Sequence, residues 1–198
     1  MKALALTLLL AAAAHGADVV DSMHTLFQAR QWKELVAQFG AEDFSALPAE
    51  RMIDALQVRG QAYALVKDGT HAKSDLEQAA RLAPRNAAIW ISVGDNYVNN
   101  LANDEQALAA YRKALDITGP SQGWQPLTAS ISIARILTSQ LKTDDALATL
   151  QRCGAPEAMA TSWRIRFLRM YGHINAARGE EQESLANFRE ALRLEAQP

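Results

Sequence analysis

The most constraining feature of the sequence is an order of small and large apolar residues that recurs after 34 to 36 positions. Gly60 and Tyr63 recur 34 residues later as Gly94 and Tyr97. The residues that follow repeat as well: Ala72, Leu76, Ala79, Leu82 and Pro84 correspond to Ala107, Tyr111, Ala114, Ile117 and Pro120. A fixed period of this size indicates stacked supersecondary units, and the spacing within each unit is that of two helices.

Weaker copies with the same rhythm flank the two clear ones. One has Ile133, Ala134 and Leu137 on a first helix and Ala146, Leu150 and Cys153 on a second; the next has Gly172, Gly179, Ser184, Phe188, Ala191 and Leu194. Upstream, Val19 to Phe39 predicts a degenerate hairpin whose second helix is short. We therefore expect a degenerate hairpin at residues 17–52 and a repeat domain at 53–198, with repeats at about 53–86, 87–120, 127–160 and 165–198.

The unit at residues 89–120 carries the full pattern: Trp90, the pair Val93-Gly94, Tyr97, then alanine, aromatic, alanine and proline. This pattern resembles the tetratricopeptide repeat (TPR) family in an exported bacterial form. The resemblance implies an all-α fold, a right-handed superhelical solenoid of stacked antiparallel helix hairpins. The terminal repeats depart from it, with Asn175 at the tyrosine position and Ala134 at a glycine position.

The small residues have a steric role in this interpretation. At Gly60, Gly94, Ala134 and Gly172 the two helices of a hairpin can approach closely, and at Ala79, Ala114, Cys153 and Ala191 there is room for the next hairpin. Tyr111 and Phe188 are expected to insert between helices. Core aromatics of this kind make the packing specific.

The first 16 residues have the layout of a secretory signal peptide. Lys2 precedes an apolar run from Ala3 to Ala14, and small residues follow. Cleavage after Gly16 and cleavage after Ala14 both fit; an uncleaved anchor and a buried helix are the alternatives. Twelve apolar residues are fewer than the roughly 20 that span a bilayer. We expect a periplasmic or secreted protein with no stable membrane span after processing.

Composition excludes several classes of function. The formal charge of -2 and pI of about 6.1 do not suggest nucleic-acid binding. Cys153 is the single cysteine, so the chain has no internal disulfide and no cysteine-based metal cluster, and its register with the alanines favours a buried structural role. The four histidines lack metal-ligand spacing, and we find no nucleophile elbow or phosphate-binding loop. We expect no catalytic site, no metal and no cofactor.

Acidic pairs and tryptophans also receive structural interpretations. The pairs Asp104-Glu105, Asp144-Asp145 and Glu180-Glu181 each stand where a second helix should begin, and there they complement the helix dipole. Trp90 and Trp32 are assigned to packing and turn positions. Trp124, in the Gly- and Pro-containing linker 118–126, is left undetermined.

In the TPR family the first helices of the hairpins line a concave groove that holds peptides. The glycine register predicts that the groove contains Gln57, Gln61, Ile91, Ser92, Asp95, Asn99, Ile131, Ser132, Arg135, Thr138, Arg166, Arg169, Met170 and His173. It would be polar and mixed at the front and basic at the back. Arg135, Arg166 and Arg169 could bind an acidic peptide or a chain terminus, with a solvated basic face as the alternative. The Lys/Asn carboxylate clamp known in the family is not matched.

We therefore expect a non-catalytic adaptor or scaffold of the bacterial cell envelope that binds a peptide or protein in its groove. The alternative is a chaperone or assembly factor for an envelope machine such as a pilus or secretion system; an enzyme is the weakest hypothesis. Leu185, Phe188, Leu192 and Leu194 in the last hairpin raise the hypothesis of a homodimer through that hairpin. The identity of the partner and the pathway is not encoded in any recognisable motif.

Overall fold

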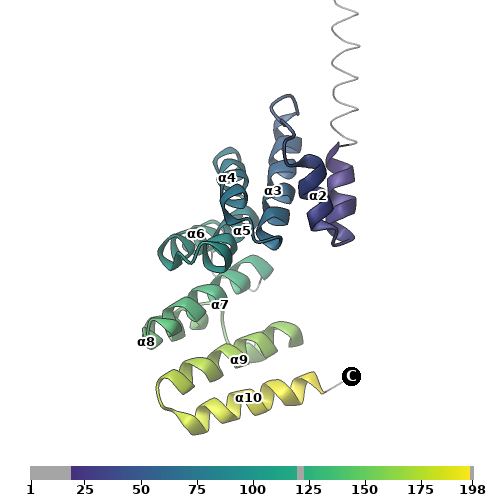
Figure 1. The fold of residues 1–198 in the computed structure, drawn as a ribbon. Helices are drawn as coiled ribbons and strands as arrows, with labels where there is room; N and C mark the ends of the chain where they lie inside the picture. Colours follow the sequence, from purple (N-terminus) through teal and green to yellow (C-terminus); the bar gives the residue numbers. More distant parts are fainter. Residues whose placement is uncertain (1–18, 120–122, 197–198) are drawn as a thin grey trace, which may run out of the picture. The chain divides into compact units, whose positions relative to one another are not determined.

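The computed structural model describes residues 19–119 and 123–196, and all regular structure within them is helical (Figure 1). The predicted signal peptide at residues 1–16 lies outside these ranges. After a helical segment at 19–28, the elements are α2 (Trp32–Phe39), α3 (Ala49–Leu65), α4 (Gly69–Leu82), α5 (Ala87–Asn100), α6 (Asp104–Thr118), α7 (Trp124–Ser139), α8 (Thr143–Gln151), the short 3₁₀ helix η1 (Pro156–Ala158), α9 (Thr161–Ala177) and α10 (Glu181–Glu195). The prediction of an all-α fold is confirmed.

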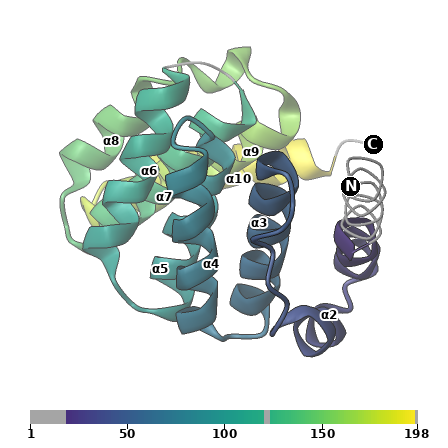
Figure 2. The same cartoon turned by 90° about the horizontal axis from the view of Figure 1, so that it is seen from above.

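The chain forms two compact units, residues 1–103 and 104–198. In the described part of the first, α3 packs along α4, while α2 contacts α3 and α5 contacts both α4 and α3 (Figure 2). In the second, α6 packs on α7, α7 pairs with α8 and α9 pairs with α10. The division between Asn103 and Asp104 falls inside the segment expected as the repeat at 87–120.

Helix starts follow the local chemistry of the sequence. The Asp68 carboxylate accepts a hydrogen bond from the backbone N–H of His71 at 3.2 Å, which caps α4, and Asn86 caps α5 in the same way. Asp104-Glu105 and Asp144-Asp145 occupy the first turns of α6 and α8, and Glu180-Glu181 begins α10. These pairs therefore stand at the positive ends of helix dipoles, as predicted.

Five turns that each follow a helix share a left-handed residue: Arg30, Lys67, Ala102, Leu141 and Gly179 have φ between 49° and 77°. Around four of them the backbone closes with a hydrogen bond five residues back, as from Asp68 N–H to the Tyr63 carbonyl at 2.9 Å. This is the Schellman end of an α-helix, which commonly uses glycine. Four of the five residues are not glycine, so the sequence pattern did not reveal the motif.

The close approach of paired helices is visible at two of the predicted glycines. A Cβ atom added to Gly60 would lie 2.8 Å from Cγ of Leu76 on α4. A Cβ added to Gly172 would lie 2.8 Å from the ring of Phe188 on α10. Both distances are far inside van der Waals contact, so the absent side chain is what allows these helices to pack. The steric interpretation of these positions is confirmed.

We predict that Gly172→Val destabilises the C-terminal hairpin by about 1–3 kcal/mol, because the new side chain overlaps the Phe188 ring. Urea denaturation followed by circular dichroism measures the change. Ala176→Val, at an exposed position on the same helix, should have a much smaller effect. Adding Phe188→Leu should restore part of the loss; equal destabilisation with and without it would contradict the steric explanation.

Candidate peptide-binding site

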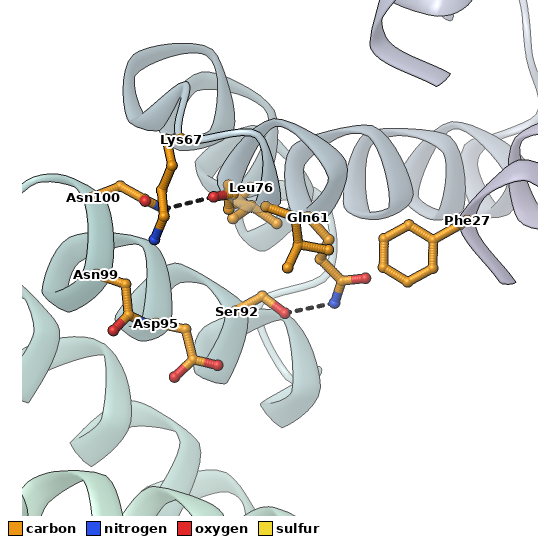
Figure 3. Close-up of a pocket in the computed structure, with 10 residues that line it drawn as sticks. Phe27, Gln61, Lys67, Leu76, Ser92, Asp95, Asn99 and Asn100 are labelled. Carbon is orange, nitrogen blue, oxygen red and sulfur yellow. Dashed lines mark hydrogen bonds between the residues drawn. The ribbon is translucent and has the colours of Figure 1, made fainter. Parts of the chain in front are cut away.

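A pocket of about 510 Å³ lies on the first unit, where the helical segment 19–28, α3 and α5 meet (Figure 3). Its lining comes from four helices and one turn: Phe27, Gln61, Ala64, Leu65, Lys67, Leu76, Ser92, Asp95, Asn99 and Asn100. A volume of this size is within the range of pockets that hold small ligands or a few peptide side chains. It is a candidate binding site that belongs wholly to one compact unit.

One part of the lining is apolar. Ala64 and Leu65 follow Gln61 by three and four residues on α3, so these two apolar side chains lie on the same face of the helix as Gln61. Leu65 is 45% exposed, so a bound group could cover part of this side chain. Phe27 adds an aromatic wall from the preceding hairpin, and Leu76 contributes from α4. This part of the pocket can bury an aliphatic group.

The other part is polar and comes mainly from α5. Ser92, Asp95 and Asn99 lie on one face of this helix, at spacings of three and four residues, and Figure 3 shows them in a row that continues to Gln61. The Gln61 amide donates a hydrogen bond to Oγ of Ser92 at 2.8 Å. Phe27 lies at one end of this row and Lys67 at the other. The rim therefore offers amide, hydroxyl and carboxylate groups, with one cation at its end.

The end of the pocket near α4 is fixed by two hydrogen-bonded asparagine side chains, of which Asn96 is buried and Asn100 half-buried. The Asn100 side chain donates to the Ala64 carbonyl at 3.1 Å and to Oδ1 of Asn96 at 3.0 Å. Asn96 is buried and donates in turn to the Gly69 carbonyl at 3.0 Å. Because this chain links α5 to both α3 and the start of α4, the rim residues on α5 are held at a set position relative to α3.

A buried arginine on α3, Arg59, holds the first hairpin against that helix. Arg59 and Asp75, 9% and 6% exposed, form a bidentate pair with N···O distances of 2.7 and 2.9 Å. Nη1 of Arg59 donates to the carbonyls of Phe39 and Glu42 at 3.0 and 2.8 Å, and its guanidinium lies 4.4 Å from the centre of the Phe44 ring. One side chain thus ties α3 to α4 and to the segment after α2.

Surface contacts attach the helical segment 19–28, which carries Phe27, to α3. His24 lies 2.9 Å from the Asp54 carboxylate, and Arg51 donates to Asp21 at 2.7 Å. Val20 and Met23 of the same segment are fully buried. The wall formed by Phe27 therefore rests on apolar packing, with a histidine–carboxylate hydrogen bond and an arginine–carboxylate ion pair beside it.

Four of the predicted groove residues meet in this pocket: Gln61, Ser92, Asp95 and Asn99. Gln57 is half-buried one turn earlier on α3. Ile91 is only 4% exposed and belongs to the buried core, so the prediction that it lines the groove is not met. The expected polar and mixed front of the groove is thus represented by a compact site with an apolar floor.

The predicted basic residues lie on α7 and α9 of the second unit. Arg135 is exposed, Ile131 and Thr138 are half-buried and Ser132 is buried, while the Thr138 hydroxyl donates to the Ala134 carbonyl. Arg166 stacks on the Trp163 ring, Arg169 pairs with Glu195 at 2.7 Å and His173 lies edge-on to Phe188; Met170 is buried. Internal partners thus occupy two of the three arginines proposed to bind an acidic peptide.

Sequence reasoning missed six lining residues: Phe27, Ala64, Leu65, Lys67, Leu76 and Asn100. Leu65 and Ala64 could have been found by extending the face of Gln61 by one turn. Phe27 could not, because it belongs to the degenerate hairpin and reaches the pocket only through the packing of that hairpin on α3. Lys67 depends on the left-handed turn that follows α3.

Other chemically suggestive groups have structural surroundings. Cys153 is buried with its Sγ 3.1 Å from Oγ of Ser130, and burial raises the pKa of its thiol. Within residues 19–119 and 123–196 no group of three or more His, Cys, Asp or Glu side chains could hold a metal ion. Nor does any helix in these ranges have the length and apolar character needed to cross a membrane.

Comparison with solved structures gives several matches over nearly the full chain. MamA MSR-1 C2 superposes with a TM-score of 0.65 over 91% of this chain and 97% of its own, at 17% identity. Another crystal structure of MamA superposes with a TM-score of 0.63, over 93% of this chain and 92% of its own, at 16% identity. BtubC (BKLC) from P. vanneervenii superposes with a TM-score of 0.66, over 95% of this chain and 91% of its own, at 15% identity. These are TPR-like helical repeat proteins.

The fold is of the tetratricopeptide type. No protein-family model matches the sequence, and no curated protein does so at a significant level. At 15 to 17% identity the likeness concerns the fold alone.

We predict that Asp75→Asn lowers the free energy of unfolding by about 3–5 kcal/mol, because the charge of Arg59 would remain buried without its partner. Asp21→Asn is the matched control: it removes a carboxylate that is 68% exposed and pairs with Arg51, so it should cost below about 1 kcal/mol. Urea denaturation of both variants provides the comparison. Equal small effects would show that Arg59 does not depend on this pair.

We also predict that Cys153 reacts slowly with an aromatic disulfide reagent in the folded protein. The reagent attacks the thiolate, and burial raises the thiol pKa, so the reaction should begin only at a higher pH than for an ordinary cysteine. In denaturant the rate should rise to that of a free thiol. Rapid labelling of the native protein at neutral pH would restore Cys153 as a candidate nucleophile.

Proposed function

We propose that this protein is a non-catalytic adaptor of the bacterial cell envelope that binds a segment of another polypeptide. The observation that carries the proposal is the pocket on the first unit, which combines an apolar floor with a rim of amide, hydroxyl and carboxylate groups. Such a rim can pair with peptide N–H and C=O groups. The buried, structural surroundings of Cys153 agree with a binding rather than a catalytic role.

The position of the pocket supports a polypeptide ligand. Its polar side chains come from α3 and α5, the first helices of their repeats, and α5 presents Ser92, Asp95 and Asn99 along its axis. A row of this kind matches an extended or helical segment better than a compact metabolite. The likeness to MamA and BtubC concerns the fold alone and does not identify a ligand.

The envelope setting rests on the N-terminal sequence. Lys2, the apolar run to Ala14 and the small residues that follow have the order of a signal peptide. The described chain has a single cysteine, which is buried, so the fold would not depend on disulfide formation after export. A mature protein that begins at Ala17 or His15 is the form we propose to be active.

The proposal is tested by photo-crosslinking in cells that produce the full chain. A benzophenone amino acid placed at Asn99, an exposed position on the pocket rim, should give a crosslinked protein of defined mass in the envelope fraction. The same probe at Gln78, which is exposed on α4 of the same unit, is the matched control. Mass spectrometry identifies the captured chain.

Adding Leu65→Lys to the Asn99 probe should abolish the crosslink, because the floor of the pocket would then carry a charge. Circular dichroism confirms that this variant is folded. Equal crosslinking from both probe positions, or an adduct that survives Leu65→Lys, would refute binding in the pocket. Recovery of the protein with an intact N-terminus outside the envelope would refute the setting.

A further inference from the structure

The exposed leucine of the pocket also borders a second hollow. Leu65 lines the pocket together with Phe27, and it lines a neighbouring hollow of about 460 Å³ together with Trp32 and Val66. Because 45% of its surface is exposed, Leu65 offers an aliphatic contact to a group that enters from either side. A ligand that packs on Leu65 therefore lies beside the walls of both hollows.

Three cations stand on these walls. Lys67 lies at the end of the polar row in the pocket, and Arg30 and Lys33 line the second hollow. All three side chains are exposed. Within residues 19–119 and 123–196, none of the ion pairs involves any of them. Positive charge without an internal counterion thus flanks Leu65 on both sides.

This positive charge is a local feature. The described part of the first unit has more acidic than basic side chains. The two arginines of α3 are neutralised within the unit, Arg51 by Asp21 and Arg59 by Asp75. The cations around Leu65 differ from these arginines because their charges remain available to a ligand.

The carboxylates nearest to these cations do not cancel them. Glu34 also lines the second hollow, where it is one negative charge beside two positive ones. Asp68, the residue after Lys67, bonds to the backbone N–H and the ring of His71. Asp95 in the pocket has an interaction within the chain as well. The surroundings of Leu65 therefore complement a ligand that carries negative charge.

From this geometry we propose that the first unit binds an acidic polypeptide segment in which an aliphatic residue has an aspartate or glutamate on each side. The aliphatic side chain packs on Leu65. One carboxylate pairs with Lys67, and the other pairs with Arg30 and Lys33. This inference rests on the proposed adaptor function and specifies its ligand.

The second unit suits such a segment less well, although the sequence placed an acidic ligand there. Arg166 stacks on the Trp163 ring and Arg169 pairs with Glu195. The first unit instead combines cations that have no internal counterion with an exposed aliphatic side chain between them. The charge that attracts an acidic segment and the surface that buries its aliphatic residue are therefore found together.

The test is selection from a random heptapeptide phage library on the full chain, followed by fluorescence anisotropy with labelled peptides that have blocked ends. An extended chain rises about 3.3 Å per residue, so we expect an acidic residue within about three positions on each side of an aliphatic one. Replacing either acidic residue by its amide should weaken binding roughly threefold, and raising the salt concentration from about 0.05 to 0.5 M should weaken it too. Replacing the aliphatic residue by serine should weaken binding more than either amide does.

Protein variants complete a double-mutant cycle. Lys67→Gln should weaken binding roughly threefold, and it should have no further effect on the peptide whose amide replaces the acid that pairs with Lys67. Arg30→Gln combined with Lys33→Gln should show the same coupling to the other acid. Arg81→Gln is the matched control, because it removes an exposed cation from α4 of the same unit that lines neither hollow. It should leave the affinity unchanged.

Selection of basic or neutral peptides, failure to select any peptide, binding that is insensitive to salt, or equal losses from Lys67→Gln and Arg81→Gln would overturn the inference. The adaptor proposal is decided separately by the probe at Asn99. A protein that is captured there equally well with and without Lys67→Gln and Arg30→Gln would leave the adaptor function standing and remove the preference for an acidic segment.

Discussion

The hairpins depend on the close approach of their two helices, which small residues permit. At Gly60 and Gly172 the partner helix delivers Leu76 or Phe188 into the space that a side chain would occupy. Glycine in a helix interior costs roughly 0.5–1 kcal/mol relative to alanine, so these positions are retained against local preference. Burial of a leucine or phenylalanine side chain contributes more than this cost. The repeat period is therefore set by interhelical packing rather than by helix propensity.

The close approach of α3 and α4 also determines where polar groups can lie. Because Leu76 fills the contact between α3 and α4, the neighbouring residue Asp75 is carried into the interior, where it needs a cation. Arg59 supplies the charge and uses its remaining N–H groups on the Phe39 and Glu42 carbonyls. A buried pair of this kind adds little net stability compared with apolar packing, but it penalises any arrangement that separates its members. It fixes the first hairpin on α3 in one geometry, and with it the position of Phe27 beside the pocket.

The parts of this structure that follow from the period were predictable, and those that depend on tertiary burial were not. The positions of Gly60, Gly172 and the buried Cys153 could be predicted because packing repeats along the chain. Lys67 and Leu141 adopt left-handed turns that their side chains do not favour, so no residue preference marked them. The pairing of Arg59 with Asp75 was equally hidden, since an arginine in a helical pattern normally indicates a solvated face. The four predicted pocket residues on α3 and α5 came from the helical register, whereas the apolar floor required knowledge of how the first hairpin packs.

The helices of the first unit bury different faces, and this explains where the pocket forms. Within the first unit, α4 directs Ala72, Leu76 and Ala79 into the core, and α5 adds Ile89 and Val93 from its own buried face. The face of α5 that bears Ser92, Asp95 and Asn99 therefore does not pack against α4. Opposite this face, α3 and the first hairpin supply an apolar wall. A surface that is apolar on one side, polar on the other and fixed from beneath by Asn96 and Asn100 is preorganised. A ligand of this pocket would therefore not need to order the site before it binds, and this lowers the entropic cost of association.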